Sequence, residues 1–239
     1  KGDIGKNYSG IKQTRLATGY IDNVALSDHE TVYGGNKTGG LTWEGKTTTA
    51  QILISQRYVS TGFFNTSGIK ILEGRDVAAT DSAVVNKTIN IVITQSLEKL
   101  MGKGSALGKK IRYEGDNSGM AAQVVGVVND YVYGDMYGKP DPVTFFYSKP
   151  ENTTLMYVRL KPKADVEKAL AQMQSVMRKY NPAYPFTYQF VDDQFNRMFL
   201  SETLIGKLSR VFAALAIIIS CLGLFGLTAS TAERRTKEI

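Results

Sequence analysis

The stretch from Val211 to Ala232 reads VFAALAIIISCLGLFGLTASTA and contains no charged side chain. Arg210 and Glu233 bracket it. As a helix rising 1.5 Å per residue, these 22 residues would span about 33 Å, which matches the hydrocarbon core of a bilayer. The other interpretation is a buried core helix, but such helices are usually shorter and carry polar residues along one side. The stretch therefore predicts a transmembrane helix over residues 211–232.

The residues that flank this helix predict its orientation. Arg234, Arg235 and Lys237 follow it closely, and positive charge next to a span favours the cytoplasmic side. Lys207 and Arg210 precede it, so the local excess is small. The larger argument is that residues 1–200 form a folded domain, and long domains cross the membrane largely regardless of charge. We expect residues 1 to about 205 outside the cytoplasm and the C-terminal end inside it.

Small side chains recur at helical spacing within the span and fall on one side of the helix. Small residues let two helix backbones approach closely in lipid, whereas a lone anchor needs no such face. We therefore expect this side to pack against a partner helix through Ala213, Ala216, Ser220, Gly223, Gly226 and Ser230.

The segment before the span predicts a helix that is continuous with it. Asp192 and Asp193 offer N-cap oxygens after the strand-like residues Phe186–Val191. Apolar residues then recur with a period near 3.6, and no proline interrupts the chain from Gln194 to Ile239. The pattern predicts a stalk helix over residues 193–239 that runs through the membrane into the cytoplasm.

Strand and helix signals alternate upstream and predict an α+β domain over residues 1–192. We expect two lobes: a β-rich middle lobe at about residues 80–150, and an α/β lobe built from both chain ends. Strands are predicted at Ile21–Leu26, Ala50–Arg57, Ile89–Thr94, Lys109–Tyr113, Ala122–Asn129, Val143–Tyr147 and Leu155–Leu160, and helices at Tyr58–Thr66, Gln95–Met101 and Asp165–Tyr180.

Composition argues against catalysis, cofactors and nucleic acid. The single cysteine, Cys221, lies in the apolar stretch and the single histidine, His29, in a polar one, which leaves no zinc site and no Cys–His nucleophile pair. No phosphate-binding loop is present. The net charge is +7, but acidic and basic residues are interleaved along the chain and form no basic patch. We therefore expect no nucleic-acid partner. A basic surface facing membrane lipid fits this charge.

Two local features have both a structural and a functional interpretation. Gly74-Arg75-Asp76 could form a ligand site, but a turn with an Arg–Asp contact is favoured. Clustered aromatic residues could hold an apolar substrate, but strand core is favoured because strands prefer aromatic side chains. These aromatic residues are Tyr131, Tyr133, Tyr137, Phe145, Phe146 and Tyr147.

Several motifs together resemble the MacB-like periplasmic core domain followed by the beginning of an FtsX-like permease domain. They are YVSTGFFNTSGIKILEGRD at residues 58–76, Gly102 to Gly108 with the Lys109-Lys110-Ile111 that follows, VVGVVND at 124–130, and TAERRTKEI at 231–239. In this order they cover most of the chain. One departure is Val77, where the family usually has phenylalanine after G-R-D.

The resemblance implies a fragment of an ABC transporter permease of the bacterial inner membrane, cut from a longer polypeptide. It implies a dimer with a second permease copy, a cytoplasmic ABC ATPase, and a periplasmic or outer-membrane partner. ATP-driven motion would pass along the stalk helix to the periplasmic domain, to export or extract a substrate or to regulate that partner. The ATPase would contact the segment after the span, at Glu233, Arg234, Arg235, Lys237 and Glu238.

Two other functions remain open at this point. One is a bitopic membrane sensor, whose extracytoplasmic domain binds a ligand and whose single span leads to a signalling domain. The other is an extracytoplasmic enzyme with a C-terminal anchor, which the scarcity of catalytic residues disfavours. Three or more spans in the whole polypeptide would indicate the permease.

Overall fold

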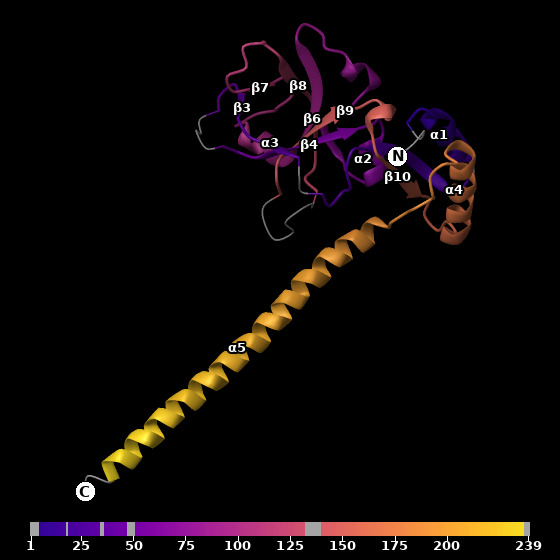
Figure 1. Ribbon diagram of the computed structural model, residues 1–239. Coiled ribbons are helices and arrows are strands. Elements are labelled where there is room, and N and C mark those ends of the chain that lie inside the picture. The colour runs from indigo at the N-terminus through magenta and orange to yellow at the C-terminus, as the bar shows by residue number, and fades with distance from the viewer. Residues whose placement is uncertain (1–4, 18, 34–35, 47–50, 132–139, 237–239) are drawn as a thin grey trace. The chain divides into compact units, whose positions relative to one another are not determined.

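The computed structural model describes residues 5–17, 19–33, 36–46, 51–131 and 140–236. The chain divides into two compact units, Lys1–Thr187 and Tyr188–Ile239. The first unit is a mixed α+β domain and the second contains one long helix, α5 (Val191–Thr236) (Figure 1). The α+β class predicted from the alternating signals is confirmed.

Ten strands in the described part of the first unit form one sheet, in the order β10-β1-β4-β9-β6-β8-β7-β3, with β2 paired to β4 and β5 paired to β8. The strands are β1 (Ile21–Ser27), β2 (Lys37–Thr38), β3 (Leu41–Trp43), β4 (Ile54–Val59), β5 (Ile71–Gly74), β6 (Thr88–Thr94), β7 (Lys110–Tyr113), β8 (Ala121–Val128), β9 (Val143–Tyr147) and β10 (Leu155–Leu160). The helices are α1 (Tyr8–Ala17), α2 (Phe63–Ser67), α3 (Gln95–Leu100) and α4 (Val166–Tyr180), with 3-10 turns η1 (Ala79–Ser82) and η2 (Pro150–Asn152).

The two chain ends of this unit pack together, as the sequence predicted. Strands β1 and β10 pair antiparallel from Ile21 opposite Leu160 to Ser27 opposite Leu155. Helices α1 and α4 contribute Tyr8 and Met173 to the apolar cluster that covers Val24 of β1. The first and last strands are therefore neighbours although more than a hundred residues separate them.

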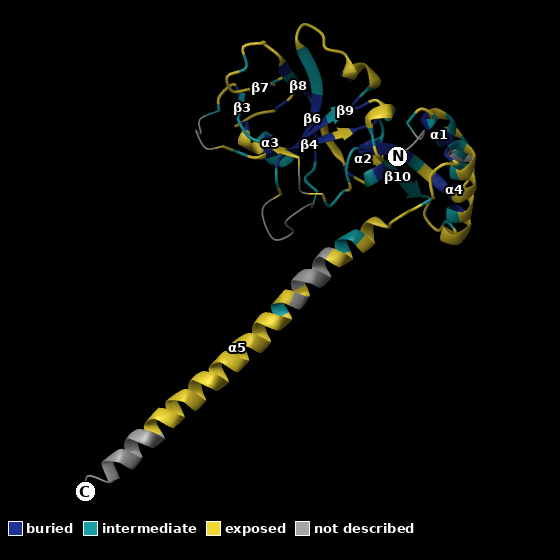
Figure 2. Ribbon diagram, viewed as in Figure 1, coloured by how far each residue is buried: buried dark blue, intermediate teal, exposed yellow. Residues whose placement is uncertain are grey.

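The middle strands enclose two further apolar clusters (Figure 2). Leu97 of α3 packs with Ile91, Ile111 and Val124, so α3 covers one face of β6, β7 and β8. Phe64 of α2 and Phe145 of β9 are fully buried, with edge-to-face ring centroids 4.9 Å apart. Phe145 is therefore strand core, whereas Tyr133 and Tyr137 of the predicted aromatic cluster lie outside the described residues.

Several local predictions differ from the structure; the strand predicted at Ala50–Arg57, for example, is observed as β4 (Ile54–Val59). Residues 186–190 form no strand, although their sequence is strand-like. The helix expected from Tyr58 begins only at Phe63, since Gly62 adopts a left-handed conformation with φ of 79° that separates it from β4. Helix α5 begins at Val191, so Asp192 and Asp193 lie in its first turn rather than at the N-cap. Carboxylates there still stabilise the helix dipole.

Candidate functional site

Two glycines allow strands β5 and β8 to approach closely. Gly74 lies opposite Gly126 in the antiparallel pair. A Cβ atom on Gly126 would lie 2.2 Å from the carbonyl oxygen of Arg75, and one on Gly74 would lie 2.2 Å from that of Val125. Gly74 also has a φ of 72°, a conformation that favours glycine. The G-R-D and V-V-G-V-V motifs therefore meet at one point of the sheet.

The Arg75 side chain extends from this pairing of β5 with β8 to a buried carboxylate. Its two terminal nitrogens lie 2.7 and 2.8 Å from the two oxygens of Asp81 in η1, a bidentate ion pair. Asn90 Nδ2 of β6 and the backbone N–H of Ala78 also donate to this carboxylate, at 2.8 and 2.7 Å. The sequence predicted an Arg–Asp contact within G-R-D, whereas the structure pairs Arg75 with Asp81, outside that motif. The adjacent Asp76 instead accepts hydrogen bonds from the backbone N–H groups of Val77 and Gly62.

These contacts keep Asp81 ionised. Its side chain is 1% exposed, and burial alone would raise the pKa of the carboxyl. The hydrogen bonds from Arg75, Asn90 and Ala78 outweigh burial and lower the pKa to about 2. The same ion pair raises the pKa of Arg75. The pair is neutral overall and fixes η1 against β6.

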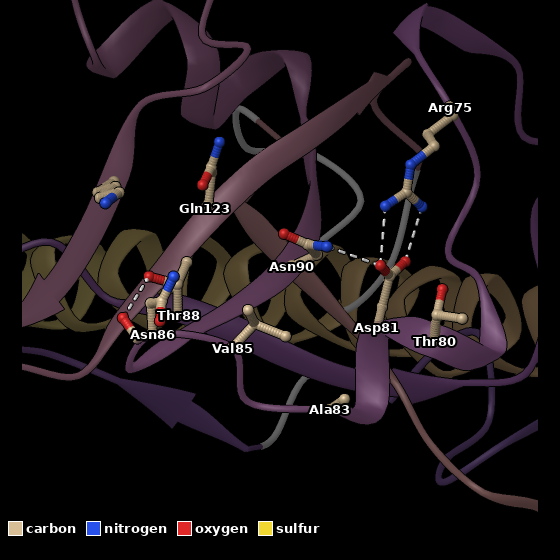
Figure 3. Close-up of a pocket in the computed structure, with 10 residues that line it drawn as sticks. Arg75, Thr80, Asp81, Ala83, Val85, Asn86, Thr88, Asn90 and Gln123 are labelled. Atoms are coloured by element: carbon tan, nitrogen blue, oxygen red, sulfur yellow. Dashed lines mark hydrogen bonds and ion pairs between the residues drawn. The ribbon is translucent and has the colours of Figure 1, made fainter.

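A polar depression of about 500 Å³ lies beside this ion pair (Figure 3). Strands β6, β7 and β8 line it, together with the segment from η1 to the turn that precedes β6. The lining residues are Arg75, Thr80, Asp81, Ala83, Val85, Asn86, Thr88, Asn90, Lys110 and Gln123. Amide and hydroxyl groups dominate, and Lys110 adds a positive charge. The depression is suited to hydrogen bonding with a polar ligand.

The depression has no arrangement typical of catalysis. Its one carboxylate, Asp81, already accepts four hydrogen bonds. Across the residues that the structure describes, no group of three or more His, Cys, Asp or Glu side chains is placed to hold a metal ion. His29 lies in another part of the domain, where its Nδ1 is 2.9 Å from Oδ2 of Asp28.

A helix that could cross a membrane is present as part of α5. The described residues contain one helix long and apolar enough to cross a membrane, at Ile205–Thr228, which overlaps the predicted 211–232 over residues 211–228. Lys207 and Arg210 lie near its first end, where long side chains extend toward lipid headgroups.

The residues predicted to pack in the membrane all belong to this helix. Five of these residues are exposed along α5: Ala213, Ala216, Ser220, Gly223 and Gly226. Ser230 also lies within the bounds of α5. Glu233, Arg234 and Arg235 of the predicted ATPase contact lie in the last turns of α5, which ends at Thr236. Lys237 and Glu238 are outside the described residues.

The sequence profile of the MacB-like periplasmic core domain matches residues 9–176, well over half of the chain. The chain belongs to this family. MacB-like periplasmic core domains are part of ABC transporter permease-type proteins and are generally non-catalytic. Membership implies, in general terms, a cytoplasmic ATPase partner and dimerisation. The resemblance drawn from the motifs is confirmed.

Among the similar solved structures, the first agrees with this family at the level of fold. The periplasmic region of MacB from Actinobacillus actinomycetemcomitans is 15% identical, with a TM-score of 0.50 over 80% of this chain and 81% of that one. The extracellular domain of the ABC-type transporter YknZ from Gram-positive bacteria is 13% identical, with a TM-score of 0.46 over 75% of this chain and 84% of that one. No curated protein sequence matches the chain.

Sequence reasoning missed the depression beside the ion pair. Asp81 stands in an Ala-Thr-Asp-Ser segment without a recognisable motif, and Asn90, Lys110 and Gln123 are ordinary polar residues in three predicted strands. Polar residues that alternate with apolar ones in a strand usually indicate only a solvated face. The pairing of the three strands is what brings these side chains together.

Proposed function

We propose that this MacB-like domain and α5 belong to a permease subunit of the bacterial inner membrane. In this proposal a second permease copy completes a dimer, and a cytoplasmic ABC ATPase supplies the motion. Helix α5 relays that motion to the periplasmic domain, which exports or extracts a substrate or acts on a periplasmic partner. Glu233, Arg234, Arg235, Lys237 and Glu238 form the segment that contacts the ATPase, and membrane lipid surrounds the span.

The uninterrupted length of α5 is the observation that carries this proposal. Its 46 residues correspond to about 69 Å of helix, while the apolar stretch of 24 residues accounts for about 36 Å. The helix therefore extends well beyond what a bilayer crossing needs. A tether to the membrane would work equally well with a break between the domain and the span, whereas a relay requires a continuous rod.

A helix transmits displacement only while its backbone hydrogen bonds continue. Proline removes one of these bonds and clashes with the preceding turn, which costs about 3 kcal/mol and kinks or breaks the helix. Thr203 is a suitable position because it is exposed and precedes both the observed apolar stretch and the predicted span. Thr203→Pro should therefore interrupt α5 without affecting membrane insertion.

The experiment compares Thr203→Pro with Thr203→Ala in the full permease. We expect Thr203→Pro to abolish transport while ATP hydrolysis and assembly stay near wild type. Alanine is a good helix former, so Thr203→Ala should transport normally. Wild-type transport by the proline variant would mean that α5 is only a tether and that the relay mechanism is wrong.

A further inference from the structure

One row of polar side chains crosses three neighbouring strands in the depression. Gln123 of β8 lies opposite Asn90 of β6 on one side and opposite Lys110 of β7 on the other. Residues directly opposite each other in a sheet point to the same face. Strands lie about 4.8 Å apart, so the row is about 10 Å long.

The opposite face of the same strands is apolar core. Ile91, Ile111 and Val124 are the neighbours of the row along their strands, and all three are buried beneath α3. Alternation therefore leaves the polar row on the face that η1 and the following turn border (Figure 3). Arg112 follows Lys110 on the same side of β7 and is exposed.

Two cations on this face have no ion-pair partner among the residues that the structure describes. They are Lys110 and Arg112. Asp81 is the one carboxylate in the lining, and Arg75 already neutralises it. The face thus presents two unpaired cations beside two amide side chains.

We propose that this face binds an extended acidic peptide segment of a periplasmic partner protein. Lys110 and Arg112 would pair with its carboxylates. Asn90 and Gln123 each carry both donors and an acceptor, which match the N–H and C=O groups of a peptide backbone. A row of about 10 Å is longer than a single carboxylate and suits about three extended residues. This inference rests on the proposed function in that it places the partner outside the cytoplasm.

Fluorescence anisotropy on the whole chain, held in zwitterionic nanodiscs, tests the proposal. The probe is a fluorescein-labelled peptide of alternating Glu and Ser, and its neutral counterpart has Gln in place of Glu. We expect the acidic peptide to bind, and Lys110→Gln to weaken binding about three- to fivefold. Lys110→Arg keeps the positive charge and should bind the acidic peptide as the wild type does. Gln123→Leu should also weaken it, by loss of a backbone contact.

Lys179→Gln is the matched control, because it removes the same charge from an exposed position on α4. Its affinity should stay within about twofold of wild type, since it lies outside the lining residues. Fluorescence of Trp43, the single tryptophan, confirms that each variant is folded.

Three outcomes would overturn the proposal. They are no binding of the acidic peptide, equal binding of the neutral peptide, or equal losses in Lys110→Gln and Lys179→Gln. Tighter binding of an oligogalacturonate than of the peptide would also overturn it, in favour of an anionic saccharide. The assay involves no ATPase, so its failure would leave the relay through α5 untouched, and failure of the relay would leave peptide binding unchanged.

Discussion

Asp81 is buried, yet it carries a charge that holds η1, β6 and the Arg75 segment together. A carboxylate in such a place is stable only because four hydrogen bonds replace the water it has lost. Removal of the charge leaves the Arg75 guanidinium without its partner. Asp81 therefore affects the stability of the domain in a way that depends on pH.

We expect Asp81→Asn to lower the free energy of unfolding by about 2 kcal/mol at pH 7. The pKa of Asp81 is about 2 when folded, against about 3.9 when unfolded, so its contribution is complete above about pH 4 and is lost as the pH falls toward 2. The difference between wild type and variant should shrink over that range. Urea denaturation followed by Trp43 fluorescence measures it.

Asp22→Asn serves as the control for this prediction. Asp22 is an exposed residue of β1, and its substitution should change the free energy of unfolding by less than about 0.5 kcal/mol. A constant gap between wild type and Asp81→Asn from pH 7 to pH 2 would contradict the role of the charge.

The close pairing of β5 and β8 leads to a second prediction. Gly126→Ala places a methyl group 2.2 Å from the backbone oxygen of Arg75, and backbone cannot rotate away as a side chain can. We expect a loss of about 1–3 kcal/mol or more in the free energy of unfolding. Gly39→Ala, whose Cβ would have its nearest neighbour at 3.7 Å, should be nearly neutral. Equal stability of the two variants in urea would show that the strands can separate without cost.

At the scale of single elements, we expect one side of α5 to pack against a partner helix through its small residues. Ala216 belongs to the predicted packing side, and Ala214 lies 200° away around the helix. Lipid contacts are available on every side, so hydrophobicity does not select one of them. The close approach of two helix backbones does select one side, because only small residues permit that approach.

Ala216→Leu should therefore weaken self-association of the chain in lipid vesicles, whereas Ala214→Leu should leave it unchanged. Energy transfer between donor- and acceptor-labelled chains measures the association, and we expect a shift of about fivefold or more in the apparent dissociation constant. An equal effect of the two leucines would place the packing side elsewhere on α5.

At the scale of the whole molecule, the proposal places the first unit outside the cytoplasm and the C-terminal end of α5 inside it. With Cys221 replaced by alanine, Asn117→Cys and Arg234→Cys each carry one thiol. An impermeant thiol reagent added to intact spheroplasts should label Asn117→Cys and spare Arg234→Cys until the membrane is opened. The reverse pattern would invert the topology and, with it, the position of the ATPase.

Local patterns in the sequence were sufficient to predict most elements. Strands at Val143–Tyr147 and Leu155–Leu160 have the predicted bounds, and helix α4 ends at the predicted Tyr180 and begins one residue after the predicted Asp165. Alternation and helical periodicity are set by neighbours in the chain. The strand-like interpretation of residues 186–191 was wrong, because a strand depends on more than its own sequence. Alternation makes a strand possible, but a neighbouring strand has to complete its hydrogen bonds.

The sequence by itself determined the family, the α+β class and the apolar helix. Each of these follows from motifs, periodicity or composition that a continuous stretch of chain contains. Only the tertiary structure decided that Arg75 pairs with Asp81, that Gly74 meets Gly126, and that Asn90, Gln123 and Lys110 form one row. The physical reason is that strand order and register bring distant residues together, and a single polar residue in a strand carries no information about which strand will lie beside it.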